Sequence, residues 1–290
     1  MKPRLADFYI IGAMKSATST LHEQLARRQA FFMTDPKEPN FFNDDRLYPE
    51  HMAWYESLFS AATAEQICGE SSTHYTKLPT FEHTAERICK HTPNARFVYI
   101  MRHPIQRLVS HYIHEWTEGR AGSDISREVL TDPQYVEYSS YARQLTPYLE
   151  CFDKTQILPV FFECLTTSKG PELERVARFL GDPSTEPFAW HSEVARTNVS
   201  SERMRKSSTR DALLSLRAVR GAKNILPAPV VERVKRIWMM RRRPVLSAEA
   251  TQFAEQRFDA DLSKLSDMLG CSINLNNFSE VARTSTLTFR

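Results

Sequence analysis

The chain has 290 residues, of which 41% are hydrophobic and 25% are charged, so its composition is that of a globular protein that is long enough to bury a large core. The formal net charge of +3 is a near balance, which argues against a histone-like protein or a polybasic membrane-binding protein. No stretch approaches the roughly 18 consecutive apolar residues of a membrane span, and the five scattered cysteines contain no Cys-x-x-Cys pair that would indicate a zinc site or a disulfide framework.

The beginning of the chain does not have the features of an export signal. Its short apolar run is interrupted by Asp7 and lacks the apolar core of a signal peptide. Because the number of cysteines is also odd, we expect a cytoplasmic protein in a reducing compartment.

Short apolar runs alternate with amphipathic segments along the first two thirds of the chain. In chain order, we expect a strand at 7–12, a helix at 18–28, helices near 49–59 and 80–91, a strand at 96–102, a helix from Pro104 to Trp116, a strand at 157–162, and helices at 171–180 and 247–269. Pro104 suits the first turn of its helix, and Gly181 and Gly270 suit the ends of the last two.

This alternation predicts an α/β fold, in which a central, mainly parallel sheet is flanked by helices and ligands bind at the carboxyl ends of the strands. No internal repeat or low-complexity linker divides the sequence. The simplest partition is therefore one domain over residues 1–290, with a core at about 5–200 and a mostly helical extension at 201–290.

The segment between the first strand and the first helix, Gly12–Thr20, has the composition of an anion-binding loop. It offers backbone N–H groups, hydroxyls and Lys15 at the N-terminus of a helix, where unpaired amides and the helix dipole favour negative charge. It is not a Walker A loop, because Lys15 precedes Ser16 without the second glycine. A helix capped by Ser or Thr, with a solvated lysine, is the alternative interpretation of this loop.

The end of the second strand offers another cation at the same edge of the sheet. Arg102 closes that strand, and Ser110 lies two turns into the following helix, so a guanidinium and a hydroxyl could hold a second phosphate. The apolar residues of this helix form one face, and Arg107, His111 and His114 fall largely elsewhere.

Four segments, taken together, resemble the sulfotransferase superfamily, whose members use 3′-phosphoadenosine 5′-phosphosulfate as sulfuryl donor. They are the loop with its flanking elements (8–21), Lys-Glu-Pro-Asn-Phe-Phe (37–42), Gly-Glu-Ser-Ser-Thr-His-Tyr (69–75) and the Arg-His-Pro segment (102–112). The resemblance covers roughly residues 5–200 and is greatest to the branch of the heparan sulfotransferases and many bacterial members. It implies a P-loop-like sulfotransferase fold and an enzyme that transfers a sulfuryl group by in-line displacement.

The resemblance also implies the roles of particular residues. The loop residues Lys15, Ser16, Ala17, Thr18, Ser19 and Thr20 would cradle the 5′-phosphosulfate, and Arg102 and Ser110 would hold the 3′-phosphate. Glu38 would be the general base, with Lys37 beside the reacting groups, and Lys15 would stabilise the oxygen of the leaving adenosine 3′,5′-bisphosphate. A surface ion pair between Lys37 and Glu38 is the alternative. This scheme requires no metal.

The chain departs from the family pattern at three positions. Ala17 stands where the family loop usually has glycine, so we expect a helical backbone there, because alanine adopts a positive φ only at a cost. His103 replaces the usual Asp before the proline, and Thr73-His74 lack the usual proline on the acceptor side. His74 and His103 could instead serve near the acceptor or the 3′-phosphate.

A basic segment at 196–243 would attract an anionic donor or acceptor, although a solvated helical surface is the alternative. Arg205 and Lys206 lie in the part that would close over the nucleotide by resemblance to the family. The acceptor would be a hydroxyl or amine of a small molecule, lipid or carbohydrate, with no nucleic acid as partner and no prediction of oligomeric state. The alternatives are a nucleotide-dependent phosphotransferase and a non-catalytic polyanion-binding module.

Overall fold

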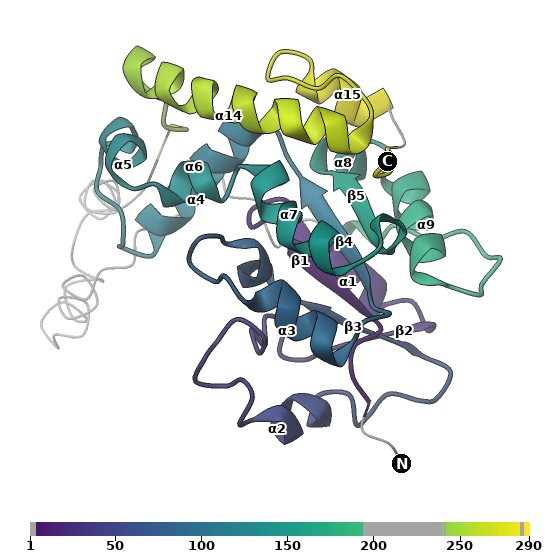
Figure 1. Cartoon of the computed structure of the whole chain (residues 1–290). Helices are drawn as coiled ribbons and strands as arrows, with labels where there is room; N and C mark the ends of the chain where they lie inside the picture. The colour runs from purple at the N-terminus through teal and green to yellow at the C-terminus, as the bar shows by residue number, and fades with distance from the viewer. Residues whose placement is uncertain (1–3, 194–239, 241, 285–286) are drawn as a thin grey trace, which may run out of the picture.

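Five parallel strands form the centre of the molecule in the computed structural model, which describes residues 4–193, 240, 242–284 and 287–290 (Figure 1). The strands are β1 (Phe8–Gly12), β2 (Phe31–Met33), β3 (Ile67–Ser71), β4 (Arg96–Met101) and β5 (Ile157–Phe161). Their order across the sheet is β2-β3-β1-β4-β5, and every neighbouring pair is parallel. The expected α/β fold with a parallel sheet is confirmed.

Helices connect and cover the strands. They are α1 (Thr18–Ala26), α2 (Met52–Ser57), α3 (Thr84–His91), α4 (Pro104–Thr117), α5 (Ile125–Thr131), α6 (Gln134–Glu137), α7 (Tyr141–Cys151), α8 (Phe162–Thr167), α9 (Lys169–Leu180), α14 (Ala248–Leu269) and α15 (Phe278–Thr284), with 3-10 turns η1 (Thr73–Thr76) and η2 (Lys154–Gln156). Gly181 and Gly270 end α9 and α14 in the left-handed conformation, as expected for glycine caps.

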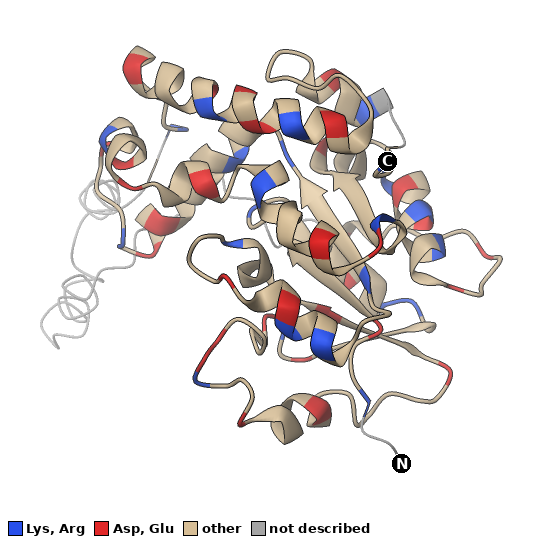
Figure 2. Ribbon diagram, viewed as in Figure 1, with Lys and Arg blue, Asp and Glu red and all other residues tan. Residues whose placement is uncertain are grey.

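Side chains of the strands alternate between two apolar layers, because successive residues of a strand point to opposite faces of the sheet. Tyr9 and Phe97 pack with Ile88 of α3 and Leu145 of α7 on one face. On the other face, leucines of α1 and α9 cover a second set, which comprises Phe8, Ile10, Val98, Ile100, Leu158 and Val160. The sheet is therefore buried on both sides, and its strands carry almost no charged residues (Figure 2).

The last long helix, α14, packs on the same core from the end of the chain. Leu262 and Leu265 belong to the apolar layer of β4 and α7, and the Asp261 carboxylate accepts hydrogen bonds of 3.0 Å from the backbone N–H groups of Ala142 and Arg143 at the start of α7. Acidic and basic residues share its remaining surface (Figure 2). The single-domain partition stays a prediction, because residues 194–239 lie outside the described ones.

The topology brings three connections to one edge of the sheet. β3, β1 and β4 are neighbours, so the segments that follow Ser71, Gly12 and Met101 leave the sheet side by side. β1 continues into the loop before α1, β3 into η1, and β4 into Arg102 and α4. This is the edge at which a parallel α/β sheet binds its ligands. Within the described ranges, no helix combines the length and apolar character needed to cross a membrane.

Candidate active site

A cavity of about 730 Å³ opens at this edge of the sheet. Its wall contains most of the residues that the sequence analysis predicts for the site. They are Lys15, Ala17, Thr18, Ser19, Thr20, Glu38, Arg102 and Ser110. Further lining residues include Thr73, His74, Lys77, His114, Glu115, Arg120, Phe162, Lys169 and Trp190.

The loop after β1 turns through two residues in the left-handed region. Lys15 has a φ of +69° and Ala17 a φ of +68°, so the expectation of a helical backbone at Ala17 is wrong. Ala17 is the N-cap of α1, and no side chain caps this helix. The first N–H groups of α1 consequently lie at the cavity without an intrahelical acceptor, which is the arrangement that binds anions at helix N-termini.

This backbone conformation predicts the effect of Ala17→Gly. Because a left-handed conformation costs an L-residue about 1–2 kcal/mol, and the flexibility of glycine in the unfolded chain offsets part of the gain, we expect the variant to be as stable as the wild type or up to about 1 kcal/mol more stable. Urea denaturation of both chains measures the difference.

The control for this change is Ala260→Gly, an exposed alanine in the middle of α14. Glycine in a helix interior lowers stability by about 1 kcal/mol. The two substitutions should therefore differ in their effect, and an equal loss of stability in both would contradict the left-handed conformation of Ala17.

Arg102, directly after β4, brings a guanidinium to the cavity. Its Nη1 donates to the Lys15 carbonyl at 3.3 Å, and its Cζ lies 4.3 Å from the centre of the Phe162 ring. Its Nε is buried and has no hydrogen-bond partner among the described residues. Because buried N–H groups are nearly always paired, this Nε is suited to an anionic ligand.

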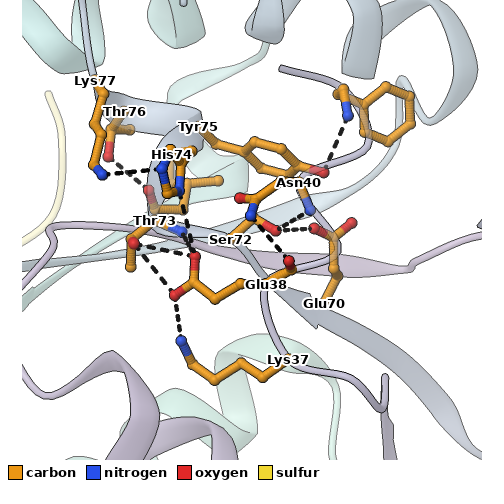
Figure 3. Close-up of polar contacts among 12 residues, drawn as sticks. Lys37, Glu38, Asn40, Glu70, Ser72, Thr73, His74, Tyr75, Thr76 and Lys77 are labelled. Atoms are coloured by element: carbon orange, nitrogen blue, oxygen red, sulfur yellow. Dashed lines mark hydrogen bonds and ion pairs between the residues drawn. The ribbon is translucent and has the colours of Figure 1, made fainter. Parts of the chain in front are cut away.

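The segment that carries Glu38 is held by the end of β3 (Figure 3). Its backbone N–H donates to the Ser71 carbonyl at 2.9 Å, and the N–H of Asn40 donates to Ser72 Oγ at 3.1 Å. Glu38 and Asn40 both have positive φ, at +62° and +55°. Asn40 Nδ2 also donates to the Glu38 carbonyl at 2.9 Å, which closes this turn. The backbone at Glu38 is therefore fixed relative to the sheet.

The Glu38 carboxylate is surrounded by donors. Thr73 donates to it through its backbone N–H at 2.8 Å and through its hydroxyl at 3.1 Å, and Lys37 Nζ forms an ion pair with Oε1. His74 Nδ1 lies 3.8 Å from Oε2. Burial opposes the charged form, but His74, Lys37 and Thr73 together outweigh it and lower the pKa of Glu38 to about 2. Glu38 is therefore ionised at neutral pH.

Ser72 is held in turn by a second, buried carboxyl group. Its hydroxyl donates to Glu70 Oε1 at 2.6 Å, and the Tyr55 hydroxyl donates to Oε2 of the same group. Burial raises the pKa of Glu70 to about 7. Glu70 has no exposed surface and does not line the cavity, so it supports the turn at Glu38 from behind.

Some of the residues that were predicted for the site do not line the cavity. Lys37 does not line the cavity and reaches the site through its ion pair with Glu38. Ser16 is a fully buried residue of the loop and does not line the cavity. His103 points to the opposite side, because its Nε2 contacts the Leu275 carbonyl at 3.1 Å and its ring packs on Phe278. Arg205 and Lys206 lie outside the described residues.

Four further residues line the cavity without a role predicted from the sequence, namely Lys77, Glu115, Arg120 and Lys169. Lys77 follows the Gly-Glu-Ser-Ser motif by only five residues, so its closeness to this motif is a sequence signal that could have indicated a site residue. Arg120 and Lys169 carry no sequence signal, because only the fold brings them to this edge. The wall as a whole contains more basic than acidic side chains, which favours an anionic ligand. Within the described part of the chain, no His, Cys, Asp and Glu side chains gather in threes as a metal site requires.

Comparison with known proteins agrees with this architecture. The model of the sulfotransferase family matches residues 7–186. Heparan sulfate glucosamine 3-O-sulfotransferase 3B1 of Mus musculus is 31% identical over 189 residues, which are 61% of this chain and 46% of that protein. Heparan sulfate glucosamine 3-O-sulfotransferase 5 of Homo sapiens is 29% identical over 193 residues, which are 62% of this chain and 54% of that protein. The chain thus spans about half the length of these curated relatives.

A solved structure shares the fold over nearly the whole chain. The sulfotransferase from Alicyclobacillus acidocaldarius superimposes with a TM-score of 0.67 at 18% identity and covers 93% of this chain and 98% of its own. The matched family region contains β1 to β5, the loop of Lys15, the turn of Glu38 and the strand end at Arg102. The chain belongs to the sulfotransferase family.

Proposed function

We propose that the chain transfers a sulfuryl group from 3′-phosphoadenosine 5′-phosphosulfate to a hydroxyl or amine of a small-molecule, lipid or carbohydrate acceptor. The observation that carries this proposal is one cavity that joins an uncapped helix N-terminus and Lys15, the Arg102 guanidinium, and the ionised carboxylate of Glu38. An in-line displacement requires cations at the leaving side and a proton acceptor at the attacking side.

The basic half of the wall would hold the donor. Lys15 and the residues from Ala17 to Thr20 would contact the phosphosulfate, and Arg102 with Ser110 would contact the 3′-phosphate. When bound, the donor supplies the activated sulfuryl group. Lys15 would neutralise the negative charge that develops on the leaving oxygen, and Arg205 and Lys206 would complete the site from the segment after 194.

Glu38 would orient the acceptor and take its proton. The carboxylate side chain is 27% exposed and lines the cavity, so an acceptor hydroxyl can reach it. Its backbone and carboxylate are fixed by Ser71 and Thr73, which limits the freedom of the base. When the acceptor binds, Lys37 would move away from Glu38, and the acceptor would take its place beside the carboxylate.

The class of acceptor and the cellular location of the protein are also part of this proposal. The names of the relatives above give glucosamine of heparan sulfate as their acceptor, so a heparan sulfate oligosaccharide is the first acceptor to test. The five cysteines are all unpaired thiols, which is consistent with a cytoplasmic protein. Incubation with labelled donor and a panel of sugar, lipid and phenolic acceptors tests the reaction, and phosphate transfer from ATP with magnesium, without sulfuryl transfer, would contradict it.

Binding of the donor side is tested with Arg102→Ala. We expect calorimetry to show adenosine 3′,5′-bisphosphate bound about 10- to 100-fold more weakly, since hydrogen bonds to a charged group contribute about 1.5–3 kcal/mol. Arg127→Ala is the matched control, because Arg127 is exposed on α5 and does not line the cavity. Equal affinity in the two variants would remove Arg102 from the donor site.

A further inference from the structure

Three side chains on the acceptor side of the cavity form a continuous polar chain (Figure 3). Lys77 Nζ lies 3.2 Å from His74 Nε2, and His74 Nδ1 lies 3.8 Å from Glu38 Oε2. All three line the cavity. His74 thus bridges a carboxylate and an amine with its two ring nitrogens.

The backbone that carries this chain is held from behind. Thr76 Oγ1 donates to the Ile11 carbonyl at 2.6 Å, and the Tyr148 hydroxyl donates to the Tyr75 carbonyl at 2.9 Å. Tyr75 and Thr76 are buried, whereas the His74 side chain is 37% exposed. The 3-10 turn η1 consequently directs Thr73 and His74 to the cavity and Tyr75 and Thr76 to the core, and Lys77, which follows the turn, also lines the cavity.

The contacts of His74 define its tautomer. An ammonium group at Lys77 can only donate, so Nε2 must accept and the ring proton of a neutral imidazole lies on Nδ1. A neutral amine at Lys77 can accept instead, which allows the ring proton to lie on Nε2 and leaves Nδ1 able to accept from Glu38 once Glu38 has taken the proton of the acceptor. Nδ1 is buried and has no hydrogen-bond partner among the described residues, and Glu38 Oε2 lies opposite to it. Proton transfer between these two atoms requires their 3.8 Å separation to shorten to hydrogen-bond length.

Glu38 by itself cannot retain a proton at neutral pH. The donors around it lower its pKa to about 2, so a proton taken from an acceptor must leave it again or return. Burial lowers the pKa of Lys77 to about 8, so a fraction of its amine is neutral near physiological pH. The ionisable groups around Lys77 are His74, Glu38, Arg107, His111, His114, Glu115, Arg120 and Tyr138.

We propose that His74 and Lys77 relay the acceptor proton away from Glu38. The proton passes from the acceptor hydroxyl to Glu38, and from Glu38 to His74 Nδ1, while the proton on His74 Nε2 moves to the neutral amine of Lys77. The relay ends with a Glu38 carboxylate, a neutral His74 protonated on Nδ1, and a Lys77 ammonium that returns its proton to water. This inference rests on the proposed function, because it takes Glu38 as the base.

The tautomer of His74 gives a test that requires no acceptor. In the full chain labelled with 15N-histidine, the His74 ring signals are those absent from His74→Gln. Between pH 7 and 10 the loss of the Lys77 ammonium frees Nε2 to carry the ring proton, so we expect the fraction of the Nε2–H tautomer to rise with a midpoint of about 8, while the ionised Glu38 opposite Nδ1 keeps part of the rings protonated on Nδ1. Lys77→Arg stays protonated and should keep the Nδ1 proton throughout, and the exposed Lys90→Met should titrate as the wild type. A constant tautomer in the wild type, or an unchanged shift in Lys77→Arg, would overturn the relay.

Turnover gives the second readout, with 3′-phosphoadenosine 5′-phosphosulfate as donor and a heparan sulfate oligosaccharide as acceptor. Wild-type kcat should rise with pH up to about 8–9, and Lys77→Arg should not show this rise. The variant should also have a kcat at least about 10-fold lower, because a general base contributes roughly 10²–10⁴-fold and the relay supports only part of that effect. The KM for the donor should stay the same. An equal pH profile in both chains would refute the relay. Absence of transfer by the wild type counts against the proposed function, and the NMR titration then decides the relay alone.

Discussion

Glu38→Gln is expected to lower kcat by about 10²–10⁴-fold and to leave donor affinity the same or slightly higher. Glutamine has the shape of glutamate, so the Thr73 N–H can still donate to the side-chain oxygen at this position. The amide cannot take a proton, and it no longer carries the negative charge that repels an anionic donor. Initial rates at saturating donor and calorimetry with adenosine 3′,5′-bisphosphate measure the two effects.

The control for this variant is Glu50→Gln, because Glu50 is exposed and does not line the cavity. It should retain wild-type turnover. The pH profile adds a second check, since a pKa of about 2 keeps Glu38 ionised throughout the range of an assay. A loss of activity between pH 4 and 6 must then come from other groups, and wild-type kcat in Glu38→Gln would exclude Glu38 as the base.

The fold could be predicted where the apolar pattern is strong. β1, β4 and β5 are nearly uninterrupted apolar runs, and each was expected within one or two residues of its observed bounds. β2 and β3 were not expected, because β2 has three residues and β3 contains Gly69, Glu70 and Ser71. β3 is a strand because β1 and β2 pair with it on both sides, and this tertiary effect outweighs its weak propensity.

The site could be predicted only in part, for a related reason. The loop at Lys15, the turn at Glu38 and the strand end at Arg102 each have a local sequence signal, and the parallel sheet brings them together. The conformation of Ala17 and the direction of His103 could not be derived, since both depend on packing. Ala17 has a positive φ in the loop between β1 and α1. The ring of His103 contacts the carbonyl of Leu275, which is far along the chain.

Arg107 is the largest difference between the predicted and observed positions of a polar residue. The helical pattern of α4 places it outside the apolar face, yet its side chain has no exposed surface. Its Nε donates to Ser139 Oγ at 2.6 Å, and its two Nη groups donate to the carbonyls of Tyr135 at 3.2 Å and Met14 at 3.5 Å. The helix pattern cannot show this, because the acceptors come from the loop before α1, from α6 and from the segment between α6 and α7.

Arg107→Ala is therefore expected to lower the free energy of unfolding by about 3–5 kcal/mol. The change leaves a cavity and removes a donor from the buried Ser139 Oγ, from the buried Tyr135 carbonyl and from the part-buried Met14 carbonyl, and these losses are costly. Arg107→Met should lose less stability, because the methionine side chain fills part of the space that arginine occupies, although it does not restore the hydrogen-bond donors. Urea denaturation should show that the free energy of unfolding decreases from the wild type to Arg107→Met and further to Arg107→Ala.

The control is Arg178→Ala on α9, where the arginine is exposed and forms an ion pair with Glu174. A surface ion pair contributes about 0–1 kcal/mol, so this variant should remain within about 1 kcal/mol of the wild type. Because Met14 precedes Lys15, Arg107→Ala should also weaken binding of adenosine 3′,5′-bisphosphate, and Arg178→Ala should not. Equal stability of the two alanine variants would show that the bonds of Arg107 do not hold α4 to the donor loop.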